Sequence, residues 1–498
     1  MTTVNSRSPE GVRYDIVLAN GRVIDPETGT DQVANVGIVG HTIQAITSDR
    51  LDGADVIAAD GLVVAPGFVD LHSHGQGLAE HRMRALDGVT TALELEAGVS
   101  PVRRAYANSA EDGRPINYGF AASWAGVRMH VVANAPFDAS IGDMMDRLGS
   151  STWRSTADAR ESDRIFELLE EELADGALGI GILVGYAPET DPSEYLRLAG
   201  LASDAGVPTY THARPLVEQD AHTPVDGADE IARAAAESGA HMHFCHINST
   251  SNQYLDRAST LIERAIREGA SITVEGYPYG AGMTAIGADY FQPDRLHVLG
   301  VEPTDLVYAR TGERVSGVDQ LLDLRSSDPG GLAFVNYYDE TSNPERLIQA
   351  ISFPKGSIAS DAMPFMSKES IFDPNQWPIP AFVRTHPRSC GTYGRTLRIV
   401  RESAPMSLME AIARCTLYPT RVVEQAAPSM RRKGRVQVGS DADLTVFDPQ
   451  TVTDNATYSD TMARSTGFVH VLVNGTFVVR DGELRLDARP GQGILGQR

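Results

Sequence analysis

Lysine is almost missing from this chain of 498 residues, because only three of its 43 lysines and arginines are lysines. They are Lys355, Lys368 and Lys433, so no lysine precedes residue 355. Any metal site that requires a lysine from the earlier part of the chain is therefore excluded.

Cysteine is equally scarce. The three cysteines, Cys245, Cys390 and Cys415, are odd in number and far apart, which predicts no disulfide framework. No N-terminal stretch combines basic residues with an apolar run, and no window approaches 18 uninterrupted apolar residues. We therefore expect a cytoplasmic protein with no membrane partner.

Positive charge is also in deficit, with a formal net charge of −23. Nucleic acids and anionic membranes repel such a surface, so neither is an expected partner. Hydrophobic residues make up 42% and charged residues 22%, which is typical of a globular protein with a sizeable core. A small molecule remains the expected partner, since a basic pocket can exist within an acidic protein. Assembly into a homo-oligomer stays open.

Both ends of the chain have the pattern of short strands separated by turns. The Asn-Gly steps at 20–21 and 474–475 each lie between apolar runs, a strong hairpin signal. Residues 1–64 and 431–498 are therefore expected to pair into one small β-sandwich domain.

Between these ends, strands alternate with helices. Amphipathic patterns at 162–175 and 254–268 predict helices, and Ser407 with Glu410 predicts a capping box before another helix. The pattern favours a closed parallel (β/α)8 barrel of the TIM type over residues 65–430, with an insertion around 277–356 over its mouth. The eight strand candidates are 66–72, 89–96, 117–123, 178–184, 207–212, 241–247, 271–275 and 357–361.

The first of these strands runs into His72 and His74. Side chains alternate along a strand, so the two imidazoles point the same way and suit a borderline divalent metal such as zinc. In such barrels, functional residues occupy the carboxyl ends of the strands. The other strand ends offer further candidate ligands: Glu96, His212, His246 and Asp361.

Each candidate also has a structural interpretation. His212 and Asp361 could instead be buried polar groups of the core, and Glu96 could instead be the partner of an arginine. Two glutamates, Glu94 and Glu96, on one apolar strand are costly to bury unless they pair with a cation. We predict that Glu96 is a ligand and that Glu94 lies behind it.

These residues resemble the amidohydrolase superfamily, and within it the N-acyl-D-amino-acid deacylases. The resemblance rests on His-Ser-His at 72–74 after Pro-Gly-Phe-Val-Asp, the single histidines on strands five and six, and Ser-Asp at 360–361. Gly-Val-Thr-Thr at 88–91, His-Ile-Asn-Ser at 246–249, Tyr-Pro-Tyr at 277–279 and His-Pro-Arg-Ser at 386–389 extend it over nearly the whole chain.

The resemblance implies hydrolysis of an amide in a small N-acyl amino acid or related carboxylate. One or two divalent ions, Zn2+ by preference, would supply hydroxide, because bound water has its pKa lowered to roughly 7. Asp361 would act as general base and then acid, and Tyr277 would donate to the oxyanion or merely pack. Arg214 and Arg388 are candidates for a substrate carboxylate, as is Asn248, which stands where D-aminoacylases have a lysine.

One departure from the family concerns the group that links two metal ions. D-aminoacylases place a cysteine near the position of Glu96, and many other relatives carry a carbamylated lysine on strand four; this chain has neither. We therefore predict that Glu96 links the ions. Cyclic amides such as hydantoins or dihydropyrimidines are an alternative substrate class, and a catalytically inactive scaffold is a third possibility.

Overall fold

The computed structural model describes residues 13–137, 140–367, 372–373 and 375–497. Its centre is a parallel eight-stranded sheet in the order β17-β12-β11-β10-β9-β8-β7-β6. A parallel bridge between Ser73 and Ala362 joins the two edges just beyond β6 and β17. The strands are β6 (Phe68–Asp70), β7 (Val89–Val99), β8 (Asn117–Ser123), β9 (Ile180–Ile182), β10 (Thr209–Thr211), β11 (Met242–Phe244), β12 (Ile272–Gly276) and β17 (Ser357–Ile358).

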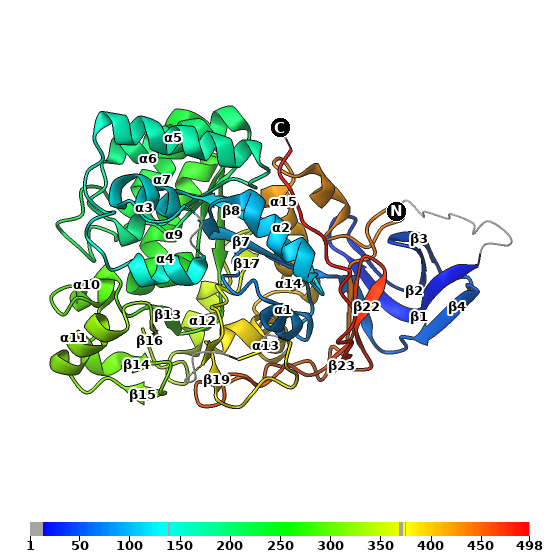
Figure 1. Cartoon of the computed structure of the whole chain (residues 1–498). Helices are drawn as coiled ribbons and strands as arrows, with labels where there is room; N and C mark the ends of the chain where they lie inside the picture. The colour runs from blue at the N-terminus through cyan, green and yellow to red at the C-terminus, as the bar shows by residue number, and fades with distance from the viewer. Residues whose placement is uncertain (1–12, 138–139, 368–371, 374, 498) are drawn as a thin grey trace.

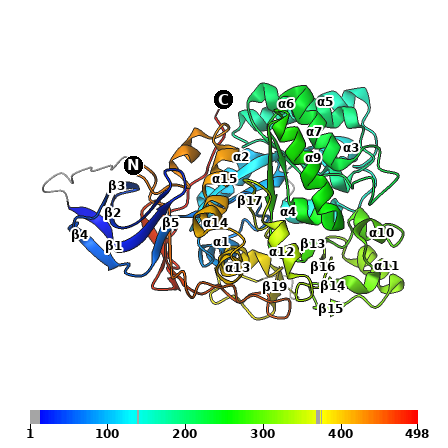
Figure 2. The ribbon, with the colours of Figure 1, turned by 180° about the vertical axis from the view of Figure 1, so that it is seen from behind.

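Helices surround this barrel (Figures 1 and 2) because their apolar faces cover the outward-facing strand residues. Ser407 accepts from the Glu410 amide as predicted, but Glu410 pairs with Arg414, so only half of the capping box forms. The helices are α1 (Leu78–Ala85), α2 (Val102–Asp112), α3 (Trp124–Ala133), α4 (Ile141–Arg147), α5 (Ala159–Ala174), α6 (Pro192–Ala205), α7 (Gly227–Ser238), α8 (Ile247–Ser251), α9 (Leu255–Arg267), α13 (Arg388–Ser403), α14 (Leu408–Cys415) and α15 (Leu417–Val423).

The two ends of the chain meet in a second, nine-stranded sheet beside the barrel (Figure 1). Its central contact is the antiparallel pairing of β5 with β20, in which Leu444 lies opposite Pro66. The strands are β1 (Tyr14–Asp25), β2 (Thr30–Val39), β3 (Thr42–Thr47), β4 (Gly53–Ala58), β5 (Val63–Pro66), β20 (Leu444–Phe447), β21 (Phe468–Val473), β22 (Thr476–Arg480) and β23 (Glu483–Leu484). The predicted fold, a barrel with a small β domain from both termini, is confirmed.

The two Asn-Gly steps of this sheet behave differently. Asn474 and Gly475 form the predicted two-residue turn between β21 and β22, both with positive φ. Asn20 also has positive φ, yet β1 continues through it with a shift of register against β2. The predicted hairpin at 20–21 is therefore wrong, and a β-bulge replaces it.

The chain between β12 and β17 forms a small layer of its own beside the barrel helices (Figure 1). Its sheet is antiparallel, in the order β13-β16-β14-β15. We call residues 277–356 the excursion. It consists of β13 (Ala281–Ala285), η3 (Asp289–Phe291), α10 (Leu296–Leu299), η4 (Pro303–Asp305), β14 (Leu306–Tyr308), β15 (Glu313–Arg314), α11 (Val318–Ser327), β16 (Leu332–Asn336) and α12 (Pro344–Ala350).

Candidate metal centre

Four histidines gather where the barrel strands end. His72 and His74 follow β6, and their Nε2 atoms lie 3.1 Å apart. His212 follows β10, and His246 follows β11. Strand ends of a parallel barrel meet at one face, which brings together residues far apart in sequence.

Glu96 lies between the four rings. Its Oε2 atom is 3.2 Å from His72 Nε2 and 3.6 Å from His74 Nε2. Its Oε1 atom is 2.8 Å from His212 Nδ1 and 2.7 Å from His246 Nε2. One carboxylate oxygen thus faces each histidine pair, which is the arrangement that a group shared by two cations requires.

The outer nitrogens of the first pair are bonded to buried carboxylates. His72 Nδ1 donates to Glu275 Oε1 at 2.6 Å, and His74 Nδ1 donates to Glu94 Oε2 at 2.8 Å. These bonds fix the tautomer, so both Nε2 atoms are available to a metal. Glu94 therefore lies behind His74 and orients its ring.

The outer nitrogens of the second pair, His212 and His246, have no carboxylate partner among the described residues. His212 Nε2 lies 3.2 Å from the Tyr290 hydroxyl, which comes from η3 of the excursion. His246 Nδ1 has no hydrogen-bond partner among the described residues, although it is buried.

The charges of this cluster fit a bound cation. Burial raises the pKa of Glu96, but His72, His246 and His212 attract its charge and lower that pKa well below the usual value. Burial lowers the pKa of His74, whereas Glu94 and Asp361 raise it, with a net result of about 10. The carboxylates therefore require positive charge beside them. Protons supply it in the metal-free protein, and a divalent ion suits the same donors.

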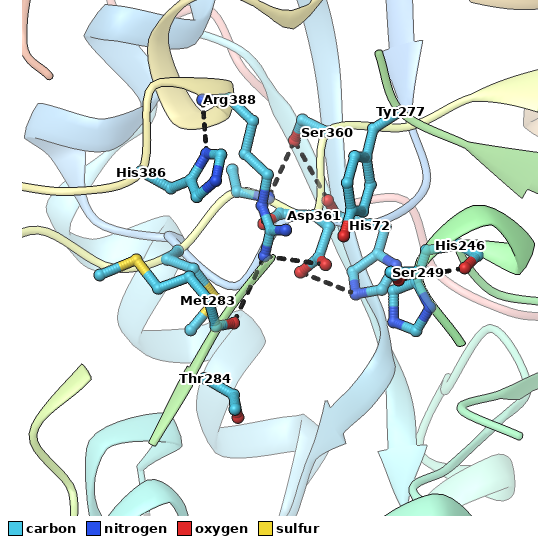
Figure 3. Close-up of polar contacts among 12 residues, drawn as sticks. His72, His246, Ser249, Tyr277, Met283, Thr284, Ser360, Asp361, His386 and Arg388 are labelled. Atoms are coloured by element: carbon cyan, nitrogen blue, oxygen red, sulfur yellow. Dashed lines mark hydrogen bonds and ion pairs between the residues drawn. The ribbon is translucent and has the colours of Figure 1, made fainter. Parts of the chain in front are cut away.

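Asp361 completes the first pair. Its Oδ1 atom lies 3.5 Å from both His72 Nε2 and His74 Nε2. Its Oδ2 atom accepts from Arg388 Nη2 at 2.8 Å, and its backbone carbonyl accepts from Arg388 Nε at 2.7 Å. Figure 3 shows the guanidinium directed at the carboxylate. Burial raises the pKa of Asp361, but Arg388 and the neighbouring histidines together lower that pKa below the usual value.

Two residues of the centre have unfavourable backbone conformations. The φ angles are 50° for Asp361 and 33° for His246, in the left-handed region that side chains with a Cβ rarely adopt. Such strain is concentrated at functional sites. At His246 the turn also ends the alternation of β11, which decides where the ring points.

Tyr277 and Arg388 both line the main cavity, whose empty volume is about 780 Å³. The guanidinium carbon of Arg388 lies 4.7 Å from the Tyr277 ring centre. Burial raises the pKa of Tyr277 to about 12, so its phenol stays protonated at neutral pH and can donate a hydrogen bond. The Nη1 atom of Arg388 has no partner among the described residues.

Two residues predicted to bind substrate are occupied elsewhere. The Arg214 guanidinium is buried and bonded to Glu230 Oε2 at 2.8 Å and to the carbonyls of Pro188 and Thr190. The Asn248 side chain bonds the backbone N–H and carbonyl of Tyr277, both at 3.3 Å. Neither residue lines the main cavity, and protein atoms already satisfy their polar groups.

The sequence reasoning missed Glu275 and Tyr290. Glu275 accepts from His72 and also lies 3.1 Å from His243 Nε2. The sequence does indicate Glu275, because it is the last residue of the predicted strand 271–275 and strand ends carry functional residues in such barrels. Tyr290 had none, because only the fold of the excursion brings it to His212.

Position 181 of β9 has no room for a side chain. Gly181 faces the end of β7, and a Cβ atom there would lie 2.4 Å from the Glu96 carbonyl oxygen and 2.5 Å from that of Leu95. The strand that carries Glu96 therefore occupies the space that such a side chain would need.

The chain is similar to known proteins in sequence and in fold. The Amidohydrolase family matches residues 55–286. The N-acyl-D-aspartate deacylase of Alcaligenes xylosoxydans xylosoxydans is 27% identical over 516 residues, covering 99% of this chain and 97% of the relative. A solved D-aminoacylase superposes with a TM-score of 0.76 at 22% identity, covering 97% of this chain and 100% of the other. An N-acyl-D-glutamate deacylase from Bordetella bronchiseptica, solved with zinc and a phosphonate inhibitor, gives 0.75 at the same identity and coverage.

The chain is thus similar to the amidohydrolase family over residues 55–286. Over nearly its full length it resembles N-acyl-D-amino-acid deacylases in sequence, and it shares the fold of a solved D-aminoacylase. In the part of the chain that the structure describes, no helix combines the length and apolar character needed to cross a membrane.

Proposed function

We propose that this protein is a metal-dependent hydrolase that cleaves the amide of a small N-acyl amino acid. The observation that carries the proposal is the position of Glu96, with one oxygen toward each histidine pair. His72, His74, Glu96 and Asp361 would hold one Zn2+, and Glu96, His212 and His246 a second. A divalent ion held there polarises a carbonyl and acidifies water.

Asp361 moves the proton in this proposal. Its carboxylate accepts a proton from the attacking water as the water oxygen adds to the amide carbon. It then returns that proton to the nitrogen as the C–N bond breaks. Arg388 holds Asp361 through two hydrogen bonds, so the carboxylate keeps one orientation during both transfers.

Tyr277 and Arg388 contact the substrate in this proposal. The protonated phenol of Tyr277 donates to the oxygen on which negative charge develops. The unpartnered Nη1 of Arg388 donates a charge-assisted hydrogen bond to the substrate carboxylate, while Nη2 of the same guanidinium stays bonded to Asp361.

The cyclic amides are not carried forward as substrates, because strand four (β9) carries no lysine to link two metal ions. We also propose that the protein works in the cytoplasm. The three cysteines are buried free thiols, which supports a reducing compartment.

The test is elemental analysis of protein purified without added metal, followed by hydrolysis assays with N-acetyl-D- and N-acetyl-L-amino acids. We expect bound zinc and release of free amino acid from one enantiomeric series. Protein that binds no divalent metal and releases no amino acid from either series would contradict the proposal.

A further inference from the structure

The main cavity has a wall that is apolar over several elements. We call this the apolar wall and define it by six residues from α4 and its following turn, the chain after β9, η3 and α10. They are Met145, Leu148, Leu183, Phe291, Val298 and Leu299. Such a wall favours an apolar group of the ligand.

Three neutral polar side chains of the cavity, Gln219, Thr284 and Tyr186, are already paired with protein atoms. Gln219 Oε1 accepts from the Leu216 amide at 2.8 Å, and its Nε2 donates to the Thr250 carbonyl at 2.9 Å. The Thr284 and Tyr186 hydroxyls bond each other at 2.7 Å. These groups therefore do not offer a free donor set for a second polar group of the substrate.

The cavity also lacks a spare positive charge. Among the lining residues that the structure describes, Arg388 is the only permanent cation, and it is paired with Asp361. Its one free donor atom, Nη1, suffices for one carboxylate oxygen. A second carboxylate would be buried without a counter-charge, which is far more costly than burying an apolar group.

We propose that this cavity selects N-acyl amino acids with a single carboxylate and an aliphatic or aromatic group that contacts the apolar wall. N-acyl derivatives of aspartate and glutamate are rejected. The inference rests on the proposed function and adds the substrate class to it. The apolar group comes from the amino-acid side chain or from the acyl chain, and the experiment distinguishes these sources.

The first experiment compares kcat/KM of the zinc-loaded full-length protein for the N-acetyl derivatives of leucine, phenylalanine, aspartate and glutamate. We expect the apolar pair to exceed the acidic pair by at least about 100-fold, as the cost of an uncompensated charge implies. Octanoyl and acetyl derivatives of alanine form the second arm. If N-octanoylalanine is hydrolysed faster than N-acetylalanine while N-acetylleucine is not, the acyl chain contacts the wall. If N-acetylleucine is faster than N-acetylalanine while N-octanoylalanine is not, the amino-acid side chain contacts it.

A charge introduced into the wall provides the matched test. Leu299 is half-buried, so it tolerates the longer polar side chains of Leu299→Lys and Leu299→Gln, and these two differ chiefly in charge. We expect Leu299→Lys to raise the glutamate-to-leucine ratio of kcat/KM by at least about tenfold, because it supplies the missing counter-charge. Leu299→Gln should leave that ratio nearly unchanged.

The outcomes separate the two claims. If acidic derivatives are hydrolysed as well as apolar ones, the apolar selectivity is wrong while the hydrolase stands. It is also wrong if the first experiment assigns the wall to the amino-acid side chain and Leu299→Lys leaves the ratio unchanged. If no N-acyl amino acid is hydrolysed by protein shown to contain zinc, the proposed function is wrong and the selectivity falls with it.

Discussion

The two histidine pairs of the centre are held in different ways. His72 and His74 follow a single strand, and each donates to a buried carboxylate, at 2.6 and 2.8 Å. His212 and His246 follow separate strands; the first meets a neutral hydroxyl at 3.2 Å, and the second has no described partner for its outer nitrogen. Carboxylate partners orient a histidine and increase its basicity more than a neutral hydroxyl does.

The contrast shows that one residue makes a single site out of two unlike halves. Glu96 contacts both pairs, whereas the closest histidine contacts of Asp361, at 3.5 Å, are with the first pair. Variants that remove a shared group, a one-sided group or an outer partner should therefore have graded effects.

The shared group should matter most. We expect Glu96→Gln to lose at least one metal ion and more than about 100-fold in kcat/KM, because losing a ligand costs more than losing a ligand's partner. Elemental analysis and amide hydrolysis measure this. Glu172→Gln, which alters a buried carboxylate that accepts from the Val102 amide, is the control and should keep its metal. Full metal content in Glu96→Gln would refute the linking role.

The one-sided group comes next. Asp361→Asn should lower turnover by about 10²- to 10⁴-fold, because an amide cannot carry the proton of the reaction. Metal at His212 and His246 should remain, since Asp361 lies closest to the other pair, His72 and His74. Turnover and metal content are measured on one preparation. Near-normal turnover would assign the base elsewhere.

An outer carboxylate should have an intermediate effect. We expect Glu94→Gln to weaken zinc binding by about 10- to 100-fold, because His74 loses its charged partner. Calorimetric titration of metal-stripped protein measures the affinity. An unchanged affinity, with the fold intact by circular dichroism, would show that Glu94 serves stability alone.

The outer hydroxyl should have the smallest effect. Tyr290→Phe removes one neutral hydrogen bond, worth about 1 kcal/mol or roughly fivefold in zinc affinity. The same titration measures it, with Tyr186→Phe as a control that removes a cavity hydroxyl bonded to Thr284 instead. A larger loss for Tyr290→Phe than for Glu94→Gln would reverse the comparison between the pairs.

Local sequence was a sound guide where neighbouring residues decide the outcome. The eight barrel strands lie within or close to their predicted ranges, since their apolar runs and the intervening helices are local patterns. The same dipeptide, Asn-Gly, nevertheless makes a turn at 474–475 and a bulge at 20–21. At the second place β1 keeps pairing with β2 on one side, and then with β4 and β5 on the other, which favours a continuous strand over a turn.

The sequence by itself determined the barrel, the β domain from both termini and the residues that end the strands, because alternation and strand order are written in local patterns. Only the tertiary structure decided what those residues contact. It buried Arg214 against Glu230, turned His246 through a left-handed bend, brought Glu275 to His72 and carried Tyr290 to His212. Such contacts join residues 16 to 203 positions apart, or follow from a single backbone angle, and no local pattern encodes either.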